Sequence, residues 1–163
     1  MSSHNPLSLL IFLLTVGFAM VLRVMSLFPA MDEFNPDWIL LVLIYWCIAL
    51  PERFGVFTAF LIGLLADVLT GRLLGQYALI FVLICYFNVQ EHRRLRQFPL
   101  LQQCLFVAAC LFGERSLMFA IEIMQGSASR LSASFWYPVL SGTLAWPLVF
   151  FLLRAIRVLA RLT

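Results

Sequence analysis

The sequence contains no lysine and few charged residues of any kind. Charged residues make up 12% of the 163 residues, whereas hydrophobic residues make up 63%. The mean hydropathy is +0.99, and a water-soluble domain of this size could not bury so much apolar surface. The composition therefore excludes an ordinary soluble domain and predicts an integral membrane protein in a lipid bilayer.

Metal-site and nucleic-acid signatures are also missing. All eleven basic residues are arginines, and they lie at the ends of apolar runs or inside them rather than on one basic face. This distribution argues against nucleic-acid binding. The two histidines lie outside the apolar runs, and no Cys-x-x-Cys pair is present. We therefore expect no metal or other cofactor, and we interpret the cysteines as small buried apolar residues. They are Cys47, Cys85, Cys104 and Cys110.

No catalytic motif is present either. The chain lacks Gly-x-Ser-x-Gly, His-Glu-x-x-His and a phosphate-binding loop. Asp67 has no second aspartate in any apolar run with which to form an intramembrane protease dyad. We therefore expect that the protein is not an enzyme. Residues 1–6 carry no basic residue before a long apolar run, which argues against a cleaved signal peptide.

Six apolar runs separated by polar turns predict an all-α integral membrane protein with six transmembrane helices in one domain, residues 1–163. The first run has 22 residues, about 33 Å as a helix, which is enough to cross a core of about 30 Å. We expect Asn35 to cap the second helix, with Pro36 in its first position. The segment 90–97 is predicted to be a loop. The expected spans are about 7–28, 36–50, 54–69, 77–89, 98–124 and 135–158.

The arginines predict the orientation of this bundle. With both termini in the cytoplasm, seven arginines lie inside and only Arg72 and Arg130 lie outside, in agreement with the positive-inside rule. The seven inner arginines are Arg53, Arg93, Arg94, Arg96, Arg154, Arg157 and Arg161.

Five charged residues remain inside the predicted spans. Arg23, Asp67, Glu114 and Arg115 lie about 20 to 24 Å from the inner ends of their helices, and Glu122 lies nearer the outer surface. Charges at one depth can neutralise each other. Three interpretations stay open: a structural ion-pair cluster, a partner or ligand site open to the outside, and unpaired side chains that reach outward. Arg23 is the nearest candidate partner for Asp67 by depth, and Arg115 is the other.

Small residues recur at intervals of four around Asp67. Gly55, Ala59, Gly63 and Gly71 lie on roughly one helix face, and such a face allows another helix to approach closely. Asp67 is therefore expected to face protein or a cavity. Two hypotheses stay open, namely a docking face for a partner and a face packed inside the bundle, against the first or the sixth span.

Four segments, taken in order, resemble the MreD family of rod shape-determining membrane proteins. They are "NPDWILLVLIYWCIALPERFGV", "GLLADVLTGRLLGQYAL", "FPLLQQ" and "WPLVFFLLR", and the resemblance covers residues 34–154. It implies a non-enzymatic subunit of the bacterial inner membrane that binds MreC. Through MreC it would work with MreB, RodA and the elongation transpeptidase in side-wall peptidoglycan synthesis.

The same resemblance suggests an alternative function. In fold, the family resembles the substrate-binding component of energy-coupling-factor vitamin transporters, a six-helix bundle with an outward pocket. A vitamin-binding transporter component is therefore the alternative to a scaffold. Against it, the first span lacks the Ala-x-x-x-Ala face that many such components use, because only Ala19 is present, with Thr15 four residues before it.

Overall fold

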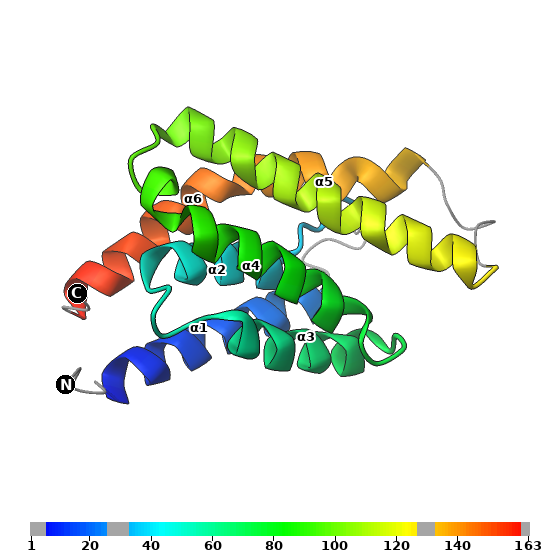
Figure 1. Cartoon of the computed structure of the whole chain (residues 1–163), viewed down its shortest axis with the longest axis horizontal. Helices are drawn as coiled ribbons and strands as arrows, with labels where there is room; N and C mark the ends of the chain where they lie inside the picture. The colour runs from blue at the N-terminus through cyan, green and yellow to red at the C-terminus, as the bar shows by residue number, and fades with distance from the viewer. Residues whose placement is uncertain (1–5, 26–32, 127–132, 161–163) are drawn as a thin grey trace.

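The computed structural model describes residues 6–25, 33–126 and 133–160, and within these ranges it is all-helical, without a strand. Six α-helices follow one another in the predicted order (Figure 1). They are α1 (Pro6–Val24), α2 (Trp38–Ala49), α3 (Val56–Thr70), α4 (Gln76–Leu95), α5 (Leu100–Met124) and α6 (Tyr137–Leu159), with the 3-10 turn η3 (Ala133–Trp136) before α6.

Three predicted boundaries are wrong. The helix α4 continues through the segment that was expected to be a loop and ends at Leu95. The residue that caps α2 is Asp37 rather than Asn35, because its carboxylate accepts a 3.1 Å hydrogen bond from the backbone amide of Leu40. Pro36 therefore precedes the helix. The helix α1 ends at Val24 and a bend follows at Met25, whereas residues 26–28 of the first predicted span lie outside the described residues.

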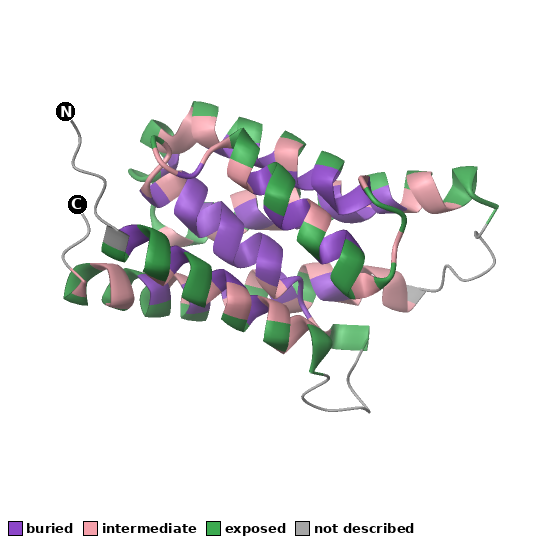
Figure 2. Cartoon of the chain, turned by 90° about the horizontal axis from the view of Figure 1, so that it is seen from below, coloured by how far each residue is buried: buried purple, intermediate pink, exposed green. Residues whose placement is uncertain are grey.

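The helix α2 forms the centre of the molecule. Every residue from Ile39 to Cys47 is buried, and Figure 2 shows this buried helix surrounded by the others. It packs against α1, α4, α6 and α5. The indole of Trp46 donates a 3.1 Å hydrogen bond to the hydroxyl of Thr15 on α1. Because α2 has only 12 residues, about 18 Å of helix, it is too short to cross a bilayer alone, but it is enclosed by protein.

The hairpin of α3 and α4 is the tightest contact between helices. A Cβ atom on Gly63 would lie 2.3 Å from the Cα of Ala78 and 2.6 Å from its amide nitrogen. The absence of a side chain at Gly63 therefore sets the spacing of the two helices, as is common between membrane helices.

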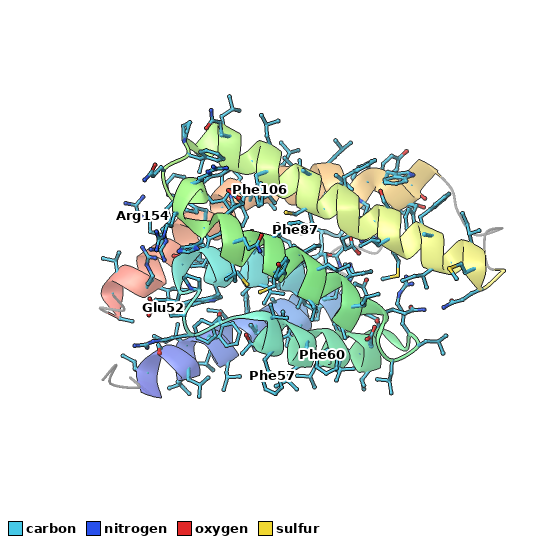
Figure 3. The ribbon with its side chains drawn as sticks, in the orientation of Figure 1. Glu52, Phe57, Phe60, Phe87, Phe106 and Arg154 are labelled. Carbon is cyan, nitrogen blue, oxygen red and sulfur yellow. The ribbon has the colours of Figure 1, made fainter. Side chains whose placement is uncertain are left out.

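The outer faces of the helices are apolar. Leu14, Phe57, Leu105 and Leu144 are each more than 60% exposed, and Figure 3 shows Phe57 on the outward side of α3. Three helical segments are long and apolar enough to span a membrane: Leu7–Val24, Leu100–Met124 and Ser134–Leu159. A surface of this kind is stable against lipid tails but not against water.

Consecutive helices run in alternating directions, so that the molecule has two distinct ends (Figure 1). The start of α1, the end of α6 and the turns after α2 and α4 share one end, where Arg53 bonds to Ser8 and Arg96 donates to the carbonyls of Ile48 and Ala49. Glu52 and Arg154 lie there too (Figure 3). We call it the arginine-rich end. The turn between α3 and α4 lies at the opposite end.

Candidate functional site

Charged side chains from four helices and one turn gather at the end opposite the arginine-rich end. We call this group, together with one tyrosine, the polar layer. Its members are Arg23 on α1, Asp37 at the start of α2, Asp67 on α3, Arg72 in the following turn, Tyr77 on α4, and Glu114, Arg115 and Glu122 on α5.

Asp67 is fully buried and binds the backbone of the next helix. Its carboxylate accepts 2.8 Å hydrogen bonds from the amides of Gly75 and Tyr77 and a 3.4 Å bond from that of Ala78. The first amides of a helix have no partner within the helix. Gly75, the capping residue of α4, has no side chain that could serve them. Asp67 therefore caps α4 from the preceding helix, and its charge is stabilised by the positive end of the helix dipole.

The turn between the helices makes this geometry possible. Gly71 ends α3 with φ +64°, and Gly75 begins α4 with φ +106°. Both values lie in the left-handed region that glycine adopts at little cost. The chain thus reverses within a few residues and directs the amides of α4 at the last turns of α3.

Arg23, the nearest candidate partner of Asp67 by depth, does not form an ion pair with it. Its Nη2 atom donates instead to the hydroxyl of Tyr77 at 3.2 Å, and no described carboxylate lies within ion-pair distance of it. Arg23 and Asp67 are nevertheless brought together, because Tyr77 contacts the first through its side chain and the second through its backbone.

Glu114 and Arg115 form a buried pair of adjacent residues. The Nε atom of Arg115 lies 3.1 Å from Oε2 of Glu114, and the side chains are 7% and 0% exposed. The alignment is too poor for a hydrogen bond, and neither carboxylate oxygen accepts one from a described residue. The guanidinium carbon of Arg115 also lies 5.4 Å from the centre of the Phe135 ring, a cation–π contact.

Arg72 and Glu122 form the second ion pair of the layer. Nη1 of Arg72 donates to Oε1 of Glu122 at 2.9 Å, which ties the α3–α4 turn to the last turns of α5. The guanidinium of Arg72 also lies 5.8 Å from the Tyr77 ring centre. Sequence reasoning placed Arg72 in an outer loop and omitted it from the cluster, as it omitted Tyr77. The position of Arg72 directly after the third span could have indicated that it lies near the predicted cluster.

The middle of the face of small residues, at Ala59 and Gly63, lies inside the bundle. Gly63 contacts the backbone of α4, and Ala59 is completely buried. Gly55 and Gly71, by contrast, have open space where a Cβ would be. The docking hypothesis is therefore wrong at Gly63, because α4 occupies the position of the expected partner. The packing hypothesis named the first or sixth span, and the neighbour is instead the fourth helix.

A cavity of about 350 Å³ adjoins the polar layer. It is lined by Arg23, Val24, Asn35, Leu69 and Thr70. The Asn35 amide is held in place, since its oxygen accepts from the Trp38 indole at 2.9 Å and its nitrogen lies 3.5 Å from the carbonyl of Arg23. In the described part of the chain, no three His, Cys, Asp or Glu side chains come together as metal ligands would.

Comparisons with known proteins agree on one family. The family described as rod shape-determining protein MreD matches residues 3–156. A protein of Haemophilus influenzae named "Rod shape-determining protein MreD" is 32% identical over 149 residues, which cover 87% of this chain and 89% of that protein. No solved structure matches the chain.

Proposed function

Because the chain belongs to the MreD family of rod shape-determining proteins, we propose that it is a non-enzymatic subunit of the bacterial elongation machinery in the inner membrane. The family match over residues 3–156 carries this proposal. Its direct test is complementation: we expect rod-shaped cells depleted of their own MreD to round up, and expression of this chain to restore rods. Round cells that contain inserted, folded protein would count against the proposal.

All six helices cross the membrane in this proposal, with both termini in the cytoplasm. The described arginines support this orientation. Arg53, Arg93, Arg94, Arg96, Arg154 and Arg157 belong to segments at the arginine-rich end, whereas Arg72 belongs to the opposite turn. Basic residues stay on the cytoplasmic side, so the polar layer would lie toward the outer surface.

The partner in this proposal is MreC, and through it MreB, RodA and the elongation transpeptidase, so that the complex directs side-wall peptidoglycan synthesis. The partner would bind an outer face of the bundle through apolar helix packing. The exposed apolar side chains support such a contact, because their helices have no protein neighbour on that side. The Gly63 face is not available, because α4 covers it.

A crosslinking scan tests this interaction. A photoreactive amino acid replaces one exposed residue on each of five helices, at Leu14, Phe57, Phe87, Leu105 and Leu144. We expect covalent capture of MreC in cells from one or two adjacent helix faces. Matched controls at the buried residues Leu41 and Phe81 should capture nothing. Capture from no exposed position, in variants that complement shape, would contradict direct binding.

The cavity supports a second candidate function, a vitamin-binding transporter component. Its volume of about 350 Å³ lies within the range of small-molecule sites. Mass spectrometry of the purified protein separates the candidates. A stoichiometric vitamin without MreC favours the transporter component, and MreC without a vitamin favours the scaffold.

A further inference from the structure

The polar layer holds four carboxylates and three arginines, and each of them except Arg23 contacts an opposite charge or a helix N-terminus. Each buried or half-buried carboxylate already has a partner: Asp37 the start of α2, Asp67 the start of α4, Glu114 the side chain of Arg115, and Glu122 that of Arg72. Glu33 is exposed and lies beyond ion-pair distance of any described arginine. Within the described ranges, Arg23 is thus the cation of the layer that has no carboxylate partner.

The partner that Arg23 does have is neutral. A guanidinium has five N–H donors, and the one bond from the Arg23 side chain to a described residue goes to the Tyr77 hydroxyl. Asp37 and Glu114 are near enough to interact with its charge but not to touch it. A half-buried cation near hydrocarbon is stabilised when an anion pairs with it directly. Arg23 lines the cavity, which is where such an anion could lie.

The border of the cavity is apolar and faces outward. Val24 and Leu69 line the cavity and are 61% and 40% exposed. Exposed side chains of α1 and α3, namely Val21, Leu65 and Val68, extend this apolar surface along both helices. The site therefore combines a cation in a polar recess with an apolar surface beside it. An amphiphile has the same two parts, an anionic head and an apolar tail.

We propose that this cavity binds the phosphate headgroup of an anionic phospholipid. Arg23 pairs with the phosphate, and Asn35 and Thr70 form the polar wall beside it. The acyl chains lie along the exposed apolar side chains of α1 and α3. A soluble anion has no apolar part that could contact Val24 and Leu69, whereas a lipid has. The lipid is therefore the better occupant. This inference goes beyond the proposed scaffold function and does not depend on MreC.

Native mass spectrometry of the purified full chain tests the proposal with three probes. Phosphatidylglycerol carries both parts, a diacylglycerol with the same chains lacks the phosphate, and inorganic phosphate lacks the chains. We expect one phosphatidylglycerol to remain bound under conditions that remove the diacylglycerol. Millimolar inorganic phosphate should not displace it. Displacement by inorganic phosphate, or equal retention of the diacylglycerol, would overturn the proposal.

Arg23→Gln should weaken phosphatidylglycerol binding about tenfold, because it removes a charge-assisted hydrogen bond. Arg94→Gln is the matched control, since it also removes one positive charge, from an exposed side chain at the arginine-rich end that belongs neither to the polar layer nor to the cavity lining, and it should bind as wild type does. Equal losses of phosphatidylglycerol affinity in both variants would indicate only a general attraction to anionic lipid and would overturn the proposed binding site.

A cavity-filling variant tests the proposal independently, in case Arg23→Gln does not fold. Thr70→Trp fills the recess and leaves the bond between Arg23 and Tyr77 intact. It loses only the hydroxyl bonds to the carbonyls of Ala66 and Asp67 within its own helix. We expect it to lose the bound lipid while its melting temperature stays close to that of wild type. Lipid retention at wild-type affinity in Thr70→Trp would contradict the proposal even if Arg23→Gln could not be purified.

Discussion

The carboxylate of Asp67 accepts a 2.8 Å hydrogen bond from the backbone amide of Tyr77, ten residues further along the chain. This contact explains a fully buried aspartate on a membrane helix. The ends of a helix leave backbone groups that hydrocarbon cannot satisfy. Here the adjacent helix supplies the acceptor for the start of α4, and side chains also satisfy both ends of α2. Asp37 caps the start of α2, and Arg96 donates to the last carbonyls of α2.

Gly63→Ala should destabilise the protein by about 1–3 kcal/mol, because the new methyl group would overlap the backbone of Ala78. Gly113→Ala is the matched control, since no atom lies within 4 Å of its added Cβ. Thermal unfolding in mild detergent measures both. Equal melting temperatures for the two variants would contradict the close packing of α3 on α4.

Charge reversal should distinguish real pairs from apparent ones. The double variant Arg72→Glu, Glu122→Arg should recover most of the stability that either single variant loses, because these side chains contact each other directly at 2.9 Å. A coupling of about 1 kcal/mol or less is expected for a partly exposed pair. Arg23→Asp with Asp67→Arg should show no recovery, since Asp67 binds backbone amides. Recovery in that second pair would contradict the capping role.

Cys47 on α2 and Cys85 on α4 should form a disulfide when a membrane-permeable oxidant is added. Their sulfur atoms lie 2.8 Å apart in the buried core. After unfolding in detergent, maleimide labelling should then count two free thiols instead of four, and Cys85→Ser should count three with or without the oxidant. Four reactive thiols in the oxidised wild-type protein would contradict the packing of α2 on α4.

The six-crossing topology predicts that the C-terminus stays in the cytoplasm. A reporter that is active only outside the cytoplasm should be inactive when fused after Thr163 and active when inserted at Ser129. The reverse pattern would contradict the orientation and would place the polar layer toward the cytoplasm.

The sequence predicted the number and order of the helices because runs of apolar residues and polar turns are local signals. It did not predict that α4 continues to Leu95, because the charged residues there are as compatible with an exposed helix end as with a loop. Nor did it predict that α2 is central. A helix that is apolar on all sides is expected both in lipid and in a protein core.

The sequence identified five of the eight residues of the polar layer, without Asp37, Arg72 and Tyr77, and it did not identify their contacts. Arg23, Asp67, Glu114 and Arg115 were identified by charge and depth. The partners of Asp67 are backbone amides, and a search of the sequence for oppositely charged side chains cannot identify them. The role of Tyr77 depends on the turn at Gly71 and Gly75, whose direction the sequence does not specify.

The central claim is that Asp67 stabilises the bundle rather than binding the proposed partner, MreC. Asp67→Ala leaves the amides of Gly75 and Tyr77 without their acceptor, which should cost about 2–4 kcal/mol. Asp67→Asn should cost less, because its amide oxygen still accepts. The decisive measurement combines the melting temperature in mild detergent with the amount of MreC that co-purifies per folded molecule. We predict a lower melting temperature and lower abundance for Asp67→Ala, with unchanged MreC per folded molecule. A variant that melts like wild type but no longer retains MreC would contradict the account.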